Sequence, residues 1–230
     1  MLSQAEKGGV QNTIQNCVTV LQNDPVLADS IRLNLLSERI DIVKPMGWQR
    51  SGPTLTDTDM MYILRRMEKY GLYSEKRVSA AIRIVANENH YHPIRDYLND
   101  LKWDGTERIS HALHRFLGAA EDELTAEALK IFLLGAIKRV FHPGCKFEMM
   151  LCLVGGQGAG KSSFFRLLAI KDEWFSDDLR RMDDDNVFRK LQGHWIMEMS
   201  EMIATANAKS IEEIKSFLSK QKETYKIPYE

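Results

Sequence analysis

The residues best suited to chemistry lie in one glycine-rich segment, residues 155–162, which reads GGQGAGKS. This segment fits the pattern Gly-x-x-x-x-Gly-Lys-Ser/Thr, in which glycines let successive backbone N–H groups turn toward one phosphate. Lys161 then reaches the β- and γ-phosphates of a nucleotide, and the hydroxyl of Ser162 supplies an oxygen ligand for Mg²⁺. The alternative is a glycine-rich turn with an exposed lysine. The expected nucleotide-binding residues are Gly155, Gly156, Gln157, Gly158, Ala159, Gly160, Lys161, Ser162 and Ser163.

Hydrolysis of a bound nucleotide also needs a carboxylate that holds magnesium or orients water. Glu198 directly follows a short apolar segment, residues 195–197, and Glu201 lies three residues further on. A carboxylate at the end of a neighbouring parallel strand would lie beside the phosphates. We therefore predict that Glu198 binds Mg²⁺, directly or through water, and that Glu201 or Glu198 polarises the attacking water. The alternatives are a solvated strand-end residue for Glu198 and a helix-cap or loop carboxylate for Glu201.

These residues need a scaffold of alternating strands and helices. Residues 149–154 form a continuous apolar run, which is typical of a strand buried on both faces of a parallel sheet. An amphipathic helix with Phe164 and Leu168 follows the glycine-rich segment, and residues 195–197 and 210–219 read as a second strand and helix. This order predicts an α/β P-loop NTPase core over residues 142–230.

The rest of the chain reads mostly as helix, so the expected fold is a mainly α N-terminal domain followed by the α/β core. We place the helical domain at residues 1–105 and a helical linker or lid region at residues 106–141. A short strand is expected at residues 39–43. Asp24 followed by Pro25 predicts the start of a helix, as does Thr106.

Charge, cysteine content and the length of the apolar runs bear on nucleic-acid binding, cellular compartment and membrane association. The formal charge of −1, from 31 basic and 32 acidic residues, gives no general support for nucleic-acid binding. Residues 65–83 and 209–226 are locally basic, which fits either phosphate binding or a solvated helix surface. Three cysteines without a Cys-x-x-Cys pair indicate a reduced, cytoplasmic setting. The longest apolar run covers only residues 131–137, whereas a membrane span needs about 20 residues, so no membrane association is expected.

Several strings together resemble the virulence-associated protein E family of phage and mobile-element proteins. Residues 193–202, GHWIMEMSEM, look like the Walker B segment of that family. The other strings are HPIRDYL at 92–98, LKWDGTERI at 101–109, HPGCKFE at 142–148, IKSFL at 214–218 and YKIPY at 225–229.

The resemblance implies a replicative NTPase related to superfamily 3 helicases. Such proteins use ATP and Mg²⁺ and act on single-stranded DNA as ring-shaped homo-oligomers. Lys215, Lys220 and Lys226 then become candidates for contacts with DNA or with a neighbouring subunit, although a solvated basic helix fits them equally well.

The sequence departs from the family pattern at a few positions. Glu148 and Glu223 stand where aspartate is usual, and Lys226 stands where arginine is usual, which removes a bidentate donor. The family continues beyond Tyr229 with a sensor strand and an arginine finger. We therefore expect this chain to be a fragment or a truncated product that hydrolyses nucleotide slowly, because a missing arginine finger costs about 10³–10⁵ in rate.

Three functions fit these observations. The first is an ATP-hydrolysing, helicase-like DNA motor. The second is a nucleotide-dependent binding or regulatory module without motor activity, and the two differ in whether DNA stimulates ATP hydrolysis. The third, a small-molecule kinase with a P-loop, is disfavoured because no arginine-rich lid segment follows Ser162.

Overall fold

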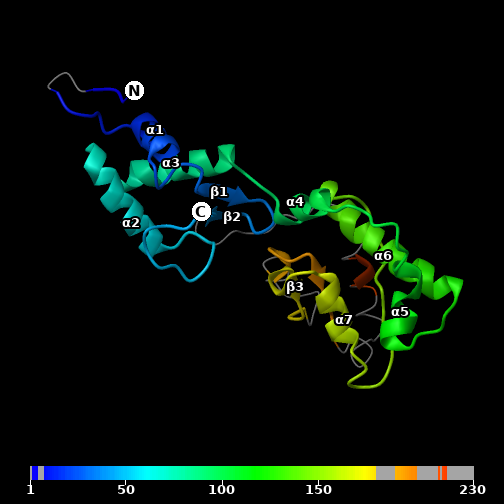
Figure 1. Cartoon of the computed structure of the whole chain (residues 1–230). Coiled ribbons are helices and arrows are strands. Elements are labelled where there is room, and N and C mark those ends of the chain that lie inside the picture. The colour runs from blue at the N-terminus through cyan, green and yellow to red at the C-terminus, as the bar shows by residue number, and fades with distance from the viewer. Residues whose placement is uncertain (1, 5–7, 180–189, 201–211, 213, 217–230) are drawn as a thin grey trace. The chain divides into compact units, whose positions relative to one another are not determined.

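The structure, a computed structural model, describes residues 2–4, 8–179, 190–200, 212 and 214–216. The chain forms two compact units, Met1–Asp96 and Tyr97–Glu230, and the division falls within helix α4 (Pro93–Asp100) (Figure 1). The sequence-based boundaries, after residues 105 and 141, lie further along the chain.

The N-terminal unit combines helices with a small hairpin. β1 and β2 pair antiparallel, with Ile31 opposite Ile42. The predicted strand at residues 39–43 is confirmed as β2, whereas β1 was not predicted. Apolar side chains from the helices and the hairpin form one core, in which Leu21, Ile63 and Ile82 are buried. In chain order the elements are α1 (Ile14–Asn23), β1 (Ile31–Asn34), β2 (Arg39–Ile42), α2 (Asp57–Met67), the 3-10 helix η1 (Glu68–Tyr70) and α3 (Glu75–Glu88).

A reciprocal cap begins α2. The Thr56 hydroxyl accepts a hydrogen bond from the Asp59 N–H, and the Asp59 carboxylate accepts one from the Thr56 N–H. This capping box pairs two backbone donors that the first turn of a helix otherwise leaves unpaired. The segment after α2 ends at Gly71, whose φ of 76° is readily adopted only by glycine.

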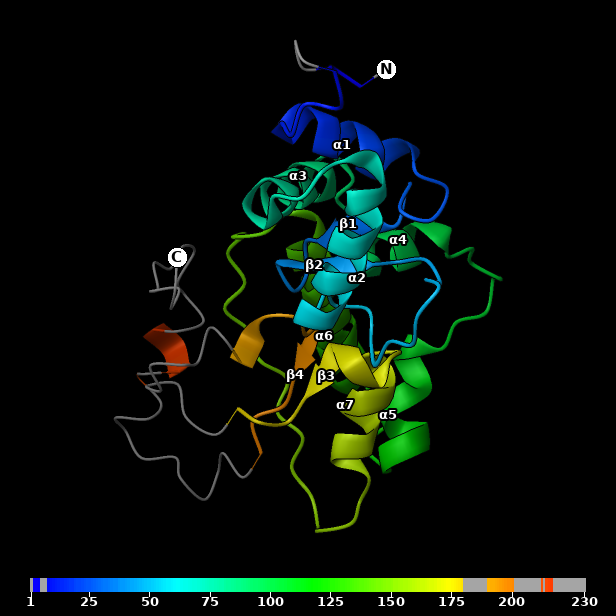
Figure 2. The ribbon, with the colours of Figure 1, turned by 90° about the vertical axis from the view of Figure 1, so that its left-hand side faces the viewer.

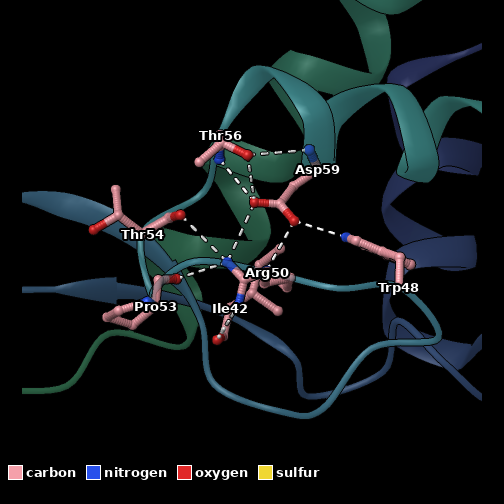
Figure 3. A network of polar contacts seen from close by, with 7 residues as sticks. All are labelled: Ile42, Trp48, Arg50, Pro53, Thr54, Thr56 and Asp59. Carbon is pink, nitrogen blue, oxygen red and sulfur yellow. Dashed lines mark hydrogen bonds and ion pairs between the residues drawn. The ribbon is translucent and has the colours of Figure 1, made fainter.

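The carboxylate of Asp59 also anchors the loop between β2 and α2 (Figure 3). Trp48 Nε1 and Arg50 Nε donate to its Oδ1 atom over 2.7 and 2.8 Å. Burial alone raises the pKa of Asp59, but the hydrogen bonds from Arg50 and Trp48 outweigh it and hold the pKa well below its ordinary value. Arg50 also donates to three backbone carbonyl oxygens, those of Ile42, Pro53 and Thr54.

The prediction that Asp24 starts a helix is wrong. Asp24 is the C-cap of α1, and the chain turns after it instead of entering a helix. Its buried carboxylate accepts hydrogen bonds from the N–H groups of Val26 and Leu27. It also accepts from Arg66 Nε over 2.5 Å and from the Tyr70 hydroxyl over 2.7 Å. Arg66 and Tyr70 lie far from Asp24 in the sequence, and they hold its side chain in this turn. The local sequence alone does not distinguish such a turn from a helix N-cap.

The C-terminal unit places three helices around a second core. Leu113, Leu129 and Phe164, one from each helix, are buried together. β3 and β4 pair parallel, with Phe175 opposite Ile196, and α7 lies beside them (Figure 2). Besides α4, the elements are α5 (Ile109–Leu117), α6 (Glu123–Phe141), α7 (Lys161–Leu168), the 3-10 helix η2 (Asp172–Trp174), β3 (Phe175–Ser176) and β4 (Ile196–Met197).

Two local predictions in this unit need correction. Residues 149–154 form no strand, because they pair with no backbone that the structure describes. Leu151 and Leu153 are partly buried against the core, but Met149 is 50% exposed and Val154 is 78% exposed, so the expected burial on both faces is wrong as well. The helix expected to begin at Thr106 instead has Arg108 as its N-cap.

The described helices also bear on membrane insertion. None of them combines the length and the apolar character that a membrane crossing requires.

Candidate functional site

The glycine-rich segment forms a tight loop that leads into α7. Gly158 and Gly160 adopt φ angles of 78° and 81°, which other residues adopt only with strain. Gly160 is the N-cap of α7, and no side chain that the structure describes caps this helix end. The first turn of α7, which carries Lys161, Ser162 and Ser163, therefore presents backbone N–H groups and the positive end of the helix dipole to an anion.

Lys161 folds back over the loop that precedes it. Its Nζ donates to the carbonyl oxygens of Gly155 and Gly156 over 2.9 and 2.8 Å. An ammonium group has three protons, so these two bonds leave a third for a further acceptor. The lysine is thus held at the loop while it keeps a donor for a phosphate oxygen.

Ser162 and Glu198 come together although they lie far apart in the sequence. The Ser162 hydroxyl donates to Glu198 Oε1 over 2.7 Å. Glu198 follows β4, and its backbone N–H donates to the carbonyl oxygen of Ser176, the last residue of β3, which fixes the strand end. The structure therefore places the strand-end carboxylate next to the first turn of α7.

The second carboxylate oxygen of Glu198 has an unusual environment. Oε2 is buried and has no hydrogen-bond partner among the residues that the structure describes. A buried carboxylate oxygen without a partner costs about 1–3 kcal/mol or more. A hard cation such as Mg²⁺ prefers carboxylate and hydroxyl oxygens, so Glu198 and Ser162 fit the chemistry of a magnesium site.

Among the described residues, two cavities adjoin the loop, and Lys161 lines both of them. The larger, of about 700 Å³, extends from Gln157 and Lys161 to Glu198 and Ser200. Its remaining walls are mostly apolar. The smaller, of about 330 Å³, lies between the loop and the helices α5 and α6. The loop is therefore flanked by space large enough for a bound small molecule.

Some predicted residues lie elsewhere. Glu201, Lys220 and Lys226 lie outside the described residues. Lys215 is described, and its ammonium group forms an ion pair with Glu212 over 2.9 Å. Its charge is therefore partly neutralised within its own segment.

Sequence reasoning missed two contributors to the site. The Ser200 hydroxyl lies 3.4 Å from Glu198 Oε1, and its position two residues after the carboxylate was the available signal. The walls supplied by α5 and α6, such as Leu117 and Leu124, were also missed. Nothing in their spacing distinguishes a leucine that lines a cavity from one that packs in a core.

The comparison with protein families bears on the class of this chain. Residues 98–230, more than half of the chain, match the virulence-associated protein E-like domain. The chain therefore belongs to the virulence-associated protein E-like family, and the family resemblance found in the sequence is confirmed. The matched region includes the glycine-rich loop, Ser162 and Glu198. The comparison with curated proteins found no match.

Proposed function

We propose that the chain binds ATP together with Mg²⁺ at residues 155–163 and hydrolyses it. The observation that carries this proposal is the 2.7 Å contact between Ser162 and Glu198 beside the Lys161 loop. It brings a phosphate-binding loop, a hydroxyl ligand and a strand-end carboxylate into one place. We propose an α/β P-loop core for the region around them.

Each group has a distinct role in this proposal. The N–H groups of the loop and of the first turn of α7 bind phosphate oxygens, and Lys161 donates its remaining proton to the β- and γ-phosphates. Ser162 and Glu198 hold Mg²⁺, which neutralises charge on the phosphates when it is bound. Glu198, or Glu201, which lies outside the described residues, orients the attacking water.

Family membership suggests a protein associated with phages or mobile elements. In that setting we propose a replicative, helicase-like activity related to superfamily 3. The chain would act in the cytoplasm on single-stranded DNA as a ring-shaped homo-oligomer. The family match and the loop geometry support this proposal together.

Magnesium dependence tests the nucleotide site. We expect calorimetry to show ATP binding by the wild type that strengthens at least tenfold when Mg²⁺ replaces EDTA. Replacement of Glu198 by glutamine removes a negatively charged ligand but keeps the size of the side chain, so this enhancement should shrink to less than about threefold. Glu173, an exposed carboxylate outside the loop and both cavities, provides the control, and Glu173→Gln should behave like the wild type. An unchanged enhancement in Glu198→Gln would remove Glu198 from the metal site.

The ion pair between Lys215 and Glu212 favours a second candidate function, a nucleotide-dependent binding module without motor activity. A lysine in an ion pair attracts a DNA phosphate less strongly than a lysine without a carboxylate partner does. The two functions differ in their response to DNA. A motor should hydrolyse ATP several-fold faster with single-stranded DNA, and its DNA affinity should fall with salt at a log–log slope of about −0.7 per phosphate contact. Unstimulated hydrolysis and no salt-dependent DNA binding would favour the module.

A further inference from the structure

One wall of the smaller cavity beside the loop belongs to neither the phosphate loop nor the magnesium site. It is bounded by Gly155, Ala159 and Lys161 on one side and by the start of α6 and the end of α5 on the other. Its volume of about 330 Å³ lies at the lower end of the range for small-molecule sites. The opposing wall is apolar and includes Leu113, Leu117, Leu124 and Ala128.

Two exposed side chains mark the opening of this cavity. Leu124 is 79% exposed and Val154 is 78% exposed, and both line the cavity. Large apolar side chains with this much contact to water, placed on two walls of one cavity, leave apolar surface that a planar ring could cover. Covering such surface is favourable by roughly 25 cal/mol per Å².

The position of Glu198 decides which end of a nucleotide reaches this cavity. Glu198 lines the larger cavity and is absent from the smaller one, although Lys161 lines both. The end of the triphosphate that binds magnesium therefore lies on the side of the larger cavity. The nucleoside end must leave the loop elsewhere, and the smaller cavity adjoins the loop at Gly155 and Ala159.

We propose that the cavity between α5, α6 and the loop binds the base of the nucleotide, with Leu124 and Val154 covering the ring. This inference rests on the proposed function, because it assigns a place to the base of the same nucleotide. The side chains that line the cavity are mostly apolar, with Thr125 and Cys152 as the exceptions outside the loop. Contact and shape therefore dominate recognition of the base.

The test separates the base from the phosphates by comparing ATP with inorganic tripolyphosphate in calorimetric titrations with Mg²⁺. Leu124→Ser should weaken ATP binding about fivefold, through lost apolar contact, and leave tripolyphosphate binding unchanged. Leu167→Ser is the matched control, because Leu167 is 76% exposed on α7 but lines neither cavity. It should change neither affinity. Circular dichroism of each variant checks that the helices are retained.

The outcomes are distinguishable. If Leu124→Ser leaves ATP affinity unchanged, or weakens both ligands equally, the base does not lie in this cavity, while the phosphate site stands. If the wild type binds ATP no more tightly than tripolyphosphate, the base makes no favourable contact. The proposed base site is then wrong, while the proposed phosphate site stands. If the wild type binds neither ligand, the proposed function fails and the base site fails with it.

Discussion

Replacement of Lys161 by alanine should lower the affinity for ATP by at least about 100-fold, as measured by calorimetry with Mg²⁺ present. The structure holds the Lys161 ammonium group at the loop through the carbonyl oxygens of Gly155 and Gly156. Alanine removes the proton that would bind the phosphates. A hydrogen bond to a charged group contributes up to about 3 kcal/mol, so losing this bond together with the positive charge beside the phosphates accounts for an effect of this size.

A lysine outside the loop gives the matched control for this experiment. Lys171 lies in the same unit, where its ammonium group contacts the Trp174 ring and lines neither cavity. Lys171→Ala should therefore bind ATP like the wild type. Affinity of the Lys161→Ala variant equal to that of the wild type would refute the phosphate-binding role of the loop.

Replacement of Asp59 by alanine should destabilise the N-terminal unit by about 3 kcal/mol or more at neutral pH. The side chain is 4% exposed, and the substitution leaves Arg50 as a largely buried charge without its carboxylate partner. Removal of one member of a buried ion pair typically costs about 3–5 kcal/mol. Amide hydrogen exchange of the full chain, measured by mass spectrometry on peptides from α2 and β2, reports the loss.

The destabilisation caused by Asp59→Ala should become smaller as the pH falls. The pKa of Asp59 is lowered in the folded chain, so its carboxylate stabilises the fold above the unfolded value of about 3.9 and loses this contribution as the pH falls through the folded value. The difference in the free energy of unfolding between Asp59→Ala and the wild type is therefore largest near pH 7 and becomes smaller below about pH 4.

Asp57→Ala is the control, because Asp57 is exposed in the same helical turn. This substitution should lower the free energy of unfolding by less than about 1 kcal/mol. Equal losses in the two variants would contradict the role of the network.

The sequence predicted the parts of the candidate site that depend on local conformation. Glycines at positions 158 and 160 indicated the loop, and the apolar pattern after Lys161 indicated α7. The structure also brings Glu198 to Ser162, although β4, which precedes Glu198, pairs with β3 and not with a strand at residues 149–154. The chemical roles of these residues stay predictions until nucleotide binding is measured.

Features that depend on partners far away in the chain could not be predicted from the pattern. The apolar run of residues 149–154 predicted a buried strand, but a strand needs a hydrogen-bonded neighbour, which periodicity does not reveal, and the run is partly exposed. Asp24 beside Pro25 fits either a helix start or a turn, and Arg66 and Tyr70 select the turn. β1, with the sequence IRLN, was also missed, and its pairing with β2 is again a contact that its own residues do not reveal.

The placement of the tryptophans gives each unit its own optical reporter. Trp48 is the only tryptophan in residues 1–96, and its indole N–H is bound to Asp59. Trp174 and Trp195 lie edge to face in the other unit, where Trp103 is 83% exposed. In a chain with phenylalanine at positions 103, 174 and 195, tryptophan fluorescence would come only from Trp48, so it would follow the unfolding of the N-terminal unit alone.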